Sequence, residues 1–169
     1  LWPERKRLLA AIEDLPCDVR FGGDDPDFKD GIDLNTALSD VVDNAEMAHY
    51  YAGARIAVNH HREFCTTDDS GDIYIDDDEA ESLGPRAYEI AACGAFQLCD
   101  DTREELTEVF GDSVATYADA DDLREQVLYY LEHDDERQEM ARAALERVRG
   151  CTFEDRARDI IVPALESIG

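Results

Sequence analysis

The second half of the chain alternates short apolar segments with longer segments of helical periodicity. Residues 95–99 and 114–117 have the pattern of strands, and the periodicity predicts helices over 84–93, 102–110 and 120–132. Strands that alternate with helices in this way form a parallel sheet, because each crossover connection places a helix on one of its faces. We therefore expect an α/β fold with a Rossmann-like parallel sheet flanked by helices.

The first half of the chain shows the same alternation less regularly. Two helices and two strands are expected there, over 1–15, 17–21, about 39–53 and 55–59. The polar segments 24–38 and 62–80 are expected to be loops, the second with a small extended piece at 73–75. Since a strand normally precedes the first helix of such a unit, we expect that strand and an N-terminal domain to be absent from this chain.

Local signals mark several helix ends. Pro85 lies where the first turn of a helix tolerates proline, and Gly94 is placed to end that helix. Thr102 and Glu105 have the spacing of a capping box. These signals support the boundaries of the helices over 84–93 and 102–110.

The chain ends in a segment with a clear apolar stripe. Apolar residues recur there at helical spacing, at Phe153, Ala157, Ile160, Ile161, Leu165 and Ile168. We expect a C-terminal packing helix over 152–168, with a kink at Pro163. Residues 1–169 are then expected to form a single domain.

The net charge excludes several classes of partner. The chain has 42 acidic and 16 basic residues, for a formal charge of −26, and 44% of its residues are hydrophobic. Such a charge repels nucleic acid and anionic membranes, and no apolar run is long enough to span a bilayer. Acid spread along a chain of normal apolar content is typical of a halophilic protein, with an acidic mesophilic protein as the alternative.

The cysteine pattern favours a reducing compartment. The five cysteines are an odd number and form no CxxC pair. Cys93 and Cys99 lie in apolar stretches, where free cysteine behaves as a small hydrophobic residue. We therefore expect a cytoplasmic protein without a disulfide framework.

A candidate anion site lies at the start of the helix over 84–93. A helix N-terminus has free backbone N–H groups and a partial positive charge, which suit a phosphate. Arg86 lies in the first turn and adds a fork of donors, and Glu89 is placed to accept hydrogen bonds from sugar hydroxyls. The alternative is an ordinary helix start in a flavodoxin-like domain, with Glu89 exposed or capping.

A second candidate cluster follows the strand over 55–59. Asn59, His60, His61 and Arg62 lie at its carboxyl end, where ligands bind in open α/β sheets. Contact with a bound ligand, an ordinary loop and a zinc site are the three interpretations. We expect no metal, because neighbouring residues point apart and no second His or Cys pair has ligand spacing.

Two stretches resemble a known family. They are EIAACGAF at 89–96 and FGDSVATYADADDL at 110–123. Both are similar to the C-terminal half of GT-B glycosyltransferases, in the group 1 set that includes spore-maturation-protein-like enzymes. The resemblance is strongest over about 50–162. It implies the fold of a GT-B C-terminal domain, which binds a nucleoside-diphosphate sugar.

The resemblance also implies roles for individual residues. Glu81 and Glu89, separated by seven residues around Gly84, match the two glutamates of the retaining branch, although Leu83 replaces the usual aromatic residue. By resemblance Glu81 is a catalytic residue that faces the donor sugar. The amides after Gly84, with that of Ala87, hold the diphosphate, and Glu89 holds the ribose. The stretch 59–62 then faces the donor cleft, with His61 as a catalytic residue.

Asp100 ends the strand over 95–99. The resemblance places it near the donor base or sugar, while a helix N-cap is the alternative.

The implied activity is the metal-independent transfer of a sugar to an unknown acceptor, with no cofactor besides the donor substrate. The acceptor then binds to an absent N-terminal domain, so this chain alone is expected to bind donor without turnover. The alternative is a non-catalytic nucleotide-binding, sugar-binding or assembly module that kept the fold. The sequence specifies neither the stereochemical outcome nor the oligomeric state.

Overall fold

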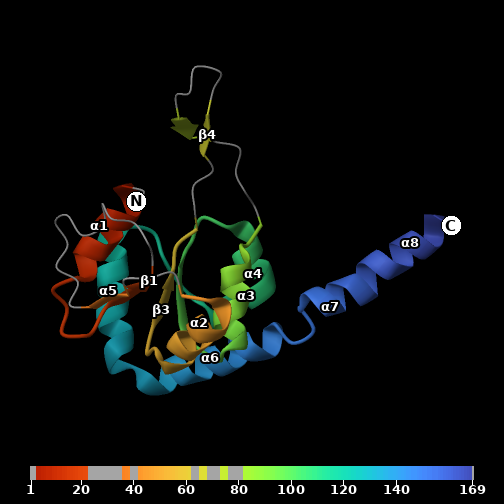
Figure 1. Ribbon diagram of the computed structural model, residues 1–169. Helices are drawn as coiled ribbons and strands as arrows, with labels where there is room; N and C mark the ends of the chain where they lie inside the picture. The colour runs from red at the N-terminus through yellow and green to blue at the C-terminus, as the bar shows by residue number, and fades with distance from the viewer. Residues whose placement is uncertain are drawn as a thin grey trace.

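A three-stranded parallel sheet forms the centre of the computed structural model (Figure 1). The structure describes residues 3–22, 36–38, 42–61, 65–67, 73–75 and 82–168. The strand order is β3 (Ala57–Asn59), β6 (Gln97–Asp100) and β7 (Ala115–Tyr117). In the register of the sheet, Asn59 lies opposite Cys99 and Asp100 lies opposite Tyr117. The sequence prediction of an α/β parallel sheet is therefore confirmed.

Helices cover both faces of this sheet. Alternation along β6 places Leu98 in one core and Cys99 in the other, and both side chains are fully buried. Leu98 packs in the core formed with α1 (Pro3–Ile12) and α5 (Ala120–Glu132). Cys99 packs in the core formed with α3 (Pro85–Ala92), α4 (Glu104–Phe110) and the end of α6 (Asp134–Arg147). The result is a helix–sheet–helix sandwich.

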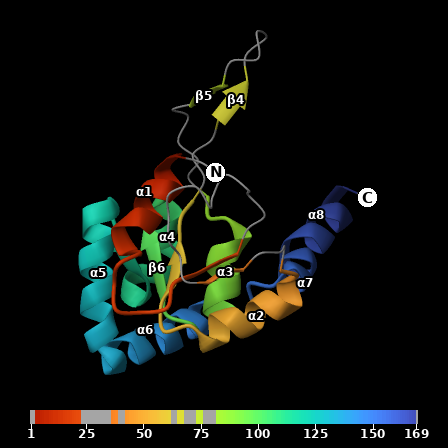
Figure 2. The same cartoon turned by 60° about the vertical axis from the view of Figure 1, so that its left-hand side comes forward.

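The other elements lie around this sandwich. The helix α2 (Asn44–Gly53) packs against α3, and a single 3-10 turn, η2 (Gly111–Ser113), leads into β7. A parallel pair is formed by β1 (Arg20–Gly22) and β2 (Thr36–Leu38), and an antiparallel pair by β4 (Cys65–Thr67) and β5 (Ile73–Ile75). The β4–β5 pair stands away from the central sheet (Figure 2).

Three local expectations differ from the structure. The extended piece at 73–75 is confirmed as a strand, but two segments expected as loop, Thr36–Leu38 and Cys65–Thr67, are also strands. They pair with β1 and β5, contacts that their own sequences do not encode. The capping box is wrong: α4 has Arg103 as its N-cap, and the Thr102 hydroxyl donates to Asp100 instead. Gly94 does end α3, with a φ of 67° that favours glycine.

The C-terminal segment is helical but does not pack through its stripe. It comprises α7 (Phe153–Arg156), the π-helical η3 (Ala157–Ile161) and α8 (Val162–Ile168). Pro163 has no N–H for residue 159, so the bonding pattern widens just before it, and the Val162 N–H donates to Ala157. Figure 1 shows this segment extending from the body of the protein. Its apolar side chains are largely exposed, with Phe153 at 85%.

Candidate functional site

The carboxyl ends of β3 and β6 bring four predicted site residues together. The two strands are parallel neighbours, so the chain after Asn59 and the end of β6 leave the sheet at the same edge. His60 and His61 follow β3, and Asp100 is the last residue of β6. Asn59 and Asp100 are both buried, each with 3% of its surface exposed.

Asp100 and His61 form a tightly bonded pair. The His61 backbone N–H donates to Asp100 Oδ2 at 2.5 Å, and His61 Nδ1 lies 3.1 Å from the same oxygen and 3.2 Å from Oδ1. Burial alone would raise the pKa of Asp100, but the bonds from His61 and Thr102 outweigh burial and hold that pKa well below its usual range. The carboxylate is therefore ionised at neutral pH.

Asp100 also contacts Thr102 and His60. The Thr102 hydroxyl donates to Oδ1, and the Thr102 backbone N–H lies 3.3 Å from that oxygen. His60 Nδ1 lies 3.5 Å from Oδ2. The Asp100 carboxylate therefore contacts His60, His61 and Thr102, which is more than the helix-capping role that was the alternative.

His60 and Asn59 face neighbours from other strands. The Tyr117 hydroxyl lies 3.2 Å from His60 Nδ1, and the two rings are stacked with centroids 6.4 Å apart. Asn59 Nδ2 donates to Gln97 Oε1 at 3.2 Å. The Asn59 side chain is therefore already hydrogen-bonded inside the protein, at the carboxyl end of β3.

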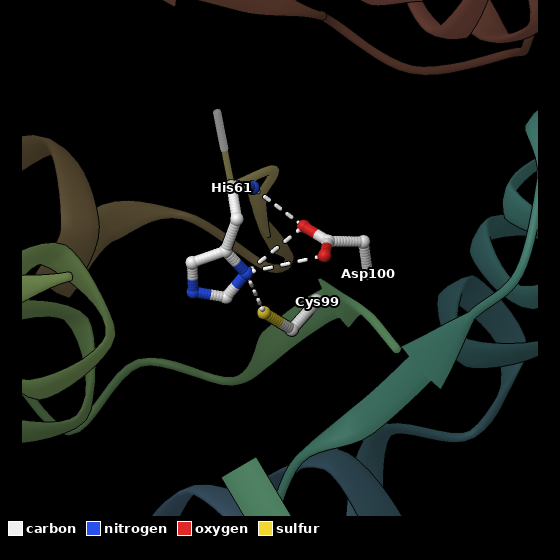
Figure 3. A group of neighbouring side chains, drawn as sticks. All are labelled: His61, Cys99 and Asp100. Carbon is white, nitrogen blue, oxygen red and sulfur yellow. Dashed lines mark hydrogen bonds and ion pairs between the residues drawn. The ribbon is translucent and has the colours of Figure 1, made fainter. Parts of the chain in front are cut away.

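The second nitrogen of the His61 ring is left open. The His61 side chain is 7% exposed, and its Nε2 is buried with no hydrogen-bond partner among the described residues. Nε2 lies on the far side of the ring from Asp100 (Figure 3). Because Nδ1 donates to the carboxylate, a ligand must reach the buried Nε2 to bond with this ring.

Cys99 is a member of this cluster that the sequence analysis did not foresee. Its Sγ lies 3.8 Å from His61 Nδ1, and Asn59 Nδ2 donates to it at 3.6 Å. Burial, with the Asp100 charge, raises the pKa of the thiol far above its usual value. The sequence analysis interpreted Cys99 as a small hydrophobic residue. The register that pairs Cys99 with Asn59 is what brings it beside His61.

The start of α3 lies on the same face as Cys99. Gly84 is the N-cap, and a side chain there would meet nothing within 4 Å. Pro85 has no N–H, and the Ala87 N–H donates to the Gly84 carbonyl. Ala87 is buried and its N–H is already bonded within the turn, so the amides of Gly84 and Arg86 are the candidates to face a phosphate.

Arg86 and Glu89 are both exposed on α3. Burial raises the pKa of Tyr51, on α2, while the nearby Arg86 opposes that shift and Glu89 adds to it. Arg86 and Glu89 thus share the side of α3 that faces the end of α2. Arg62 and Glu81, the other two predicted site residues, lie outside the described residues.

A family model covers almost the whole chain. The model described as "Glycosyl transferase-like" matches residues 5–161.

The chain belongs to the glycosyl transferase-like family.

This membership agrees with the resemblance drawn from 89–96 and 110–123, both of which lie inside the matched range. It also agrees with the parallel sheet and its helices, which are consistent with the C-terminal half of a GT-B enzyme.

A curated relative of this glycosyl transferase-like chain is the spore protein CgeB of Bacillus subtilis (strain 168). The two are 31% identical over 160 residues, which make up 91% of this chain and 48% of the relative. The chain thus spans about half the length of this relative. No solved structure matches the chain.

Within the ranges that the structure describes, no helix has both the length and the apolar composition needed to cross a bilayer.

Proposed function

We propose that this chain is the donor-binding half of a glycosyltransferase, which transfers a sugar from a nucleoside-diphosphate sugar to an acceptor hydroxyl. The observation that carries the proposal is the buried His61–Asp100 pair at the carboxyl edge of the sheet, in a member of a glycosyl transferase-like family. Ligands of open α/β sheets bind at this edge.

The start of α3 is the proposed diphosphate site. The amides of Gly84 and Arg86 and the partial positive charge of the helix end attract phosphate oxygens, and the Arg86 guanidinium adds charged donors. These groups supply the positive charge that the diphosphate needs, so its binding is proposed to require no metal or cofactor. Glu89 is proposed to accept from the ribose hydroxyls, one turn further along the helix. Glu81 and Arg62 are proposed to face the sugar and the diphosphate.

His61 is the proposed catalytic residue. A carboxylate behind a histidine ring fixes its orientation and stabilises the imidazolium when the ring takes up a proton. Asp100 has this relation to Nδ1. The protonated Nε2 then donates to an oxygen of the departing diphosphate, where negative charge builds in the transition state.

The acceptor is proposed to bind to a part of the protein that this chain lacks. The chain covers 48% of its Bacillus relative. We propose that the acceptor binds to a further domain on the N-terminal side. The cysteines 17, 93, 99 and 151 are free thiols, which supports a reducing cytoplasm as the place of action.

The experiment is a donor panel on the full-length protein. Calorimetry identifies which nucleoside-diphosphate sugar binds, and product analysis then measures transfer and donor hydrolysis. We expect His61→Gln to lower turnover by about 10²–10⁴-fold, the usual contribution of a proton-donating side chain. His49→Gln, at an exposed position on α2, is the matched control. Unchanged turnover in a folded His61→Gln protein would remove His61 from the mechanism.

A non-catalytic sugar- or nucleotide-binding or assembly module is the second candidate. It is supported by the Bacillus relative, whose name, a spore protein, describes no reaction. Donor binding without transfer or hydrolysis, across a broad acceptor panel, would favour this candidate.

A further inference from the structure

Three side chains of different chemistry converge at the end of the sheet. Nδ1 of His61, Sγ of Cys99 and a carboxylate oxygen of Asp100 all lie within 4.8 Å of one another (Figure 3). Cys99 and Asp100 are adjacent on β6, and His61 reaches them from the end of β3. Each offers one ligand atom of a type that zinc binds in proteins.

The spacing of these atoms fits a small tetrahedral ion. Zinc bond lengths of about 2.1 Å to nitrogen or oxygen and about 2.3 Å to sulfur imply ligand separations of about 3.4 Å and 3.6 Å at the tetrahedral angle. The structure has His61 Nδ1 at 3.1 Å from Asp100 Oδ2 and at 3.8 Å from Cys99 Sγ. The Cys99 sulfur and the Asp100 oxygen lie within 4.8 Å of each other, so these two side chains must approach to about 3.6 Å to admit the ion.

The surroundings of the three atoms also suit a metal. Asn59 Nδ2 donates to the sulfur, and Thr102 and the His61 amide orient the carboxylate. Such outer hydrogen bonds orient metal ligands and tune them. When Nδ1 binds a metal, the ring carries its proton on the buried Nε2, which has no partner among the described residues.

We propose that His61, Cys99 and Asp100 form a binding site for a divalent transition-metal ion, with Zn²⁺ as the best fit. The Cys99 thiol releases one proton to solvent, and the Nδ1 proton of neutral His61 is replaced by one on Nε2. Thiolate and carboxylate then neutralise the two charges of the ion, as a buried site requires. The fourth position is left to water or a ligand oxygen. Metal at Nδ1 and the Nδ1–H···Asp100 bond exclude each other, so the metal-bound protein is a state in which His61 is not the proton donor proposed above.

The test is a cobalt titration of the reduced, chelator-treated protein, without donor or acceptor. We expect saturable tetrahedral visible bands and a thiolate-to-cobalt charge-transfer band at one equivalent, both abolished by Zn²⁺, which binds such sites more tightly than cobalt. Cys99→Ser should remove the charge-transfer band. Cys93→Ser, which changes a half-buried free cysteine six residues earlier, should keep it.

A second variant covers the case in which Cys99→Ser does not fold. His61→Ala should weaken cobalt binding by more than the about 10–100-fold that loss of an outer hydrogen bond costs. Zn²⁺ should raise the melting temperature of the wild type and not of His61→Ala. The absence of a saturable band in the wild type, or equal affinity in folded His61→Ala, would overturn the metal site. Since no glycosyl transfer is measured, either result leaves the proposed transferase activity to its own experiment.

Discussion

The Glu105 carboxylate accepts a hydrogen bond from the backbone N–H of Leu83, with Oε2 at 2.5 Å from the nitrogen. Its other oxygen accepts from the Tyr88 hydroxyl at 3.3 Å. Glu105 is on α4, whereas Leu83 and Tyr88 belong to the start of α3 and its approach. One side chain of α4 therefore positions the turn at which the diphosphate is proposed to bind.

Glu105→Ala should lower the free energy of unfolding by about 1.5–3 kcal/mol, because hydrogen bonds to a charged group are lost and the Leu83 N–H keeps no such partner. Urea denaturation measures this change. Donor affinity should fall as well, although Glu105 need not touch the donor. Glu104→Ala is the control, since Glu104 is the exposed neighbour on the same helix. Equal stability of the two variants would show that the Glu105 bonds are unimportant.

Arg86→Ala should weaken the binding of a nucleoside diphosphate by about 1.5–3 kcal/mol, the contribution of a charged hydrogen bond. The guanidinium is exposed in the first turn of α3, so its removal leaves the core intact. Calorimetry with the diphosphate that binds best measures the loss. Arg142→Ala, at an exposed position on α6, removes the same charge elsewhere and should leave affinity unchanged. An equal effect of both variants would point to general electrostatics instead of a site.

Glu89→Gln should reduce donor binding or turnover while the protein stays folded. The amide keeps the shape of the side chain but loses the charge and one acceptor oxygen, which weakens recognition of ribose hydroxyls. Calorimetry with nucleoside, inorganic phosphate and intact donor separates the contributions, and Glu108→Gln on α4 is the exposed control. If all three ligands bind Glu89→Gln as they bind the wild type, Glu89 has no role in recognition.

The melting temperature should rise between 0.1 and 1 M KCl. At a formal charge of −26 the folded chain repels itself and an anionic donor. Salt shortens the screening length from about 10 Å at 0.1 M to about 3 Å at 1 M, so long-range repulsion fades before close contacts do. Calorimetry of unfolding measures the first effect, and stopped-flow binding should show no slower donor association. A flat or falling melting temperature would argue against salt adaptation.

The sequence by itself determined the elements of the central sandwich and the edge of the sheet at which the site lies. The helix over 120–132 has the bounds that its periodicity predicts, because a complete apolar stripe and the Asp119 cap both act within the segment. The positions of His60, His61 and Asp100 at strand ends also follow from local pattern, because each lies at the end of a short apolar segment. The capping box at Thr102 failed because the Thr102 backbone N–H donates to Asp100, while the Glu105 carboxylate accepts from Leu83 and Tyr88 instead.

Only the tertiary structure decided which of these side chains meet. Asn59 lies opposite Cys99 because of the register between two strands whose paired residues are 40 positions apart, and this register brings Cys99 and Asp100 to His61. The apolar stripe over 153–168 is an example in the opposite direction. Its periodicity predicts the helix correctly, but the described residues do not cover the stripe, which is largely exposed. Local patterns act through the backbone of one segment, whereas partners are chosen by the packing of segments far apart in the chain.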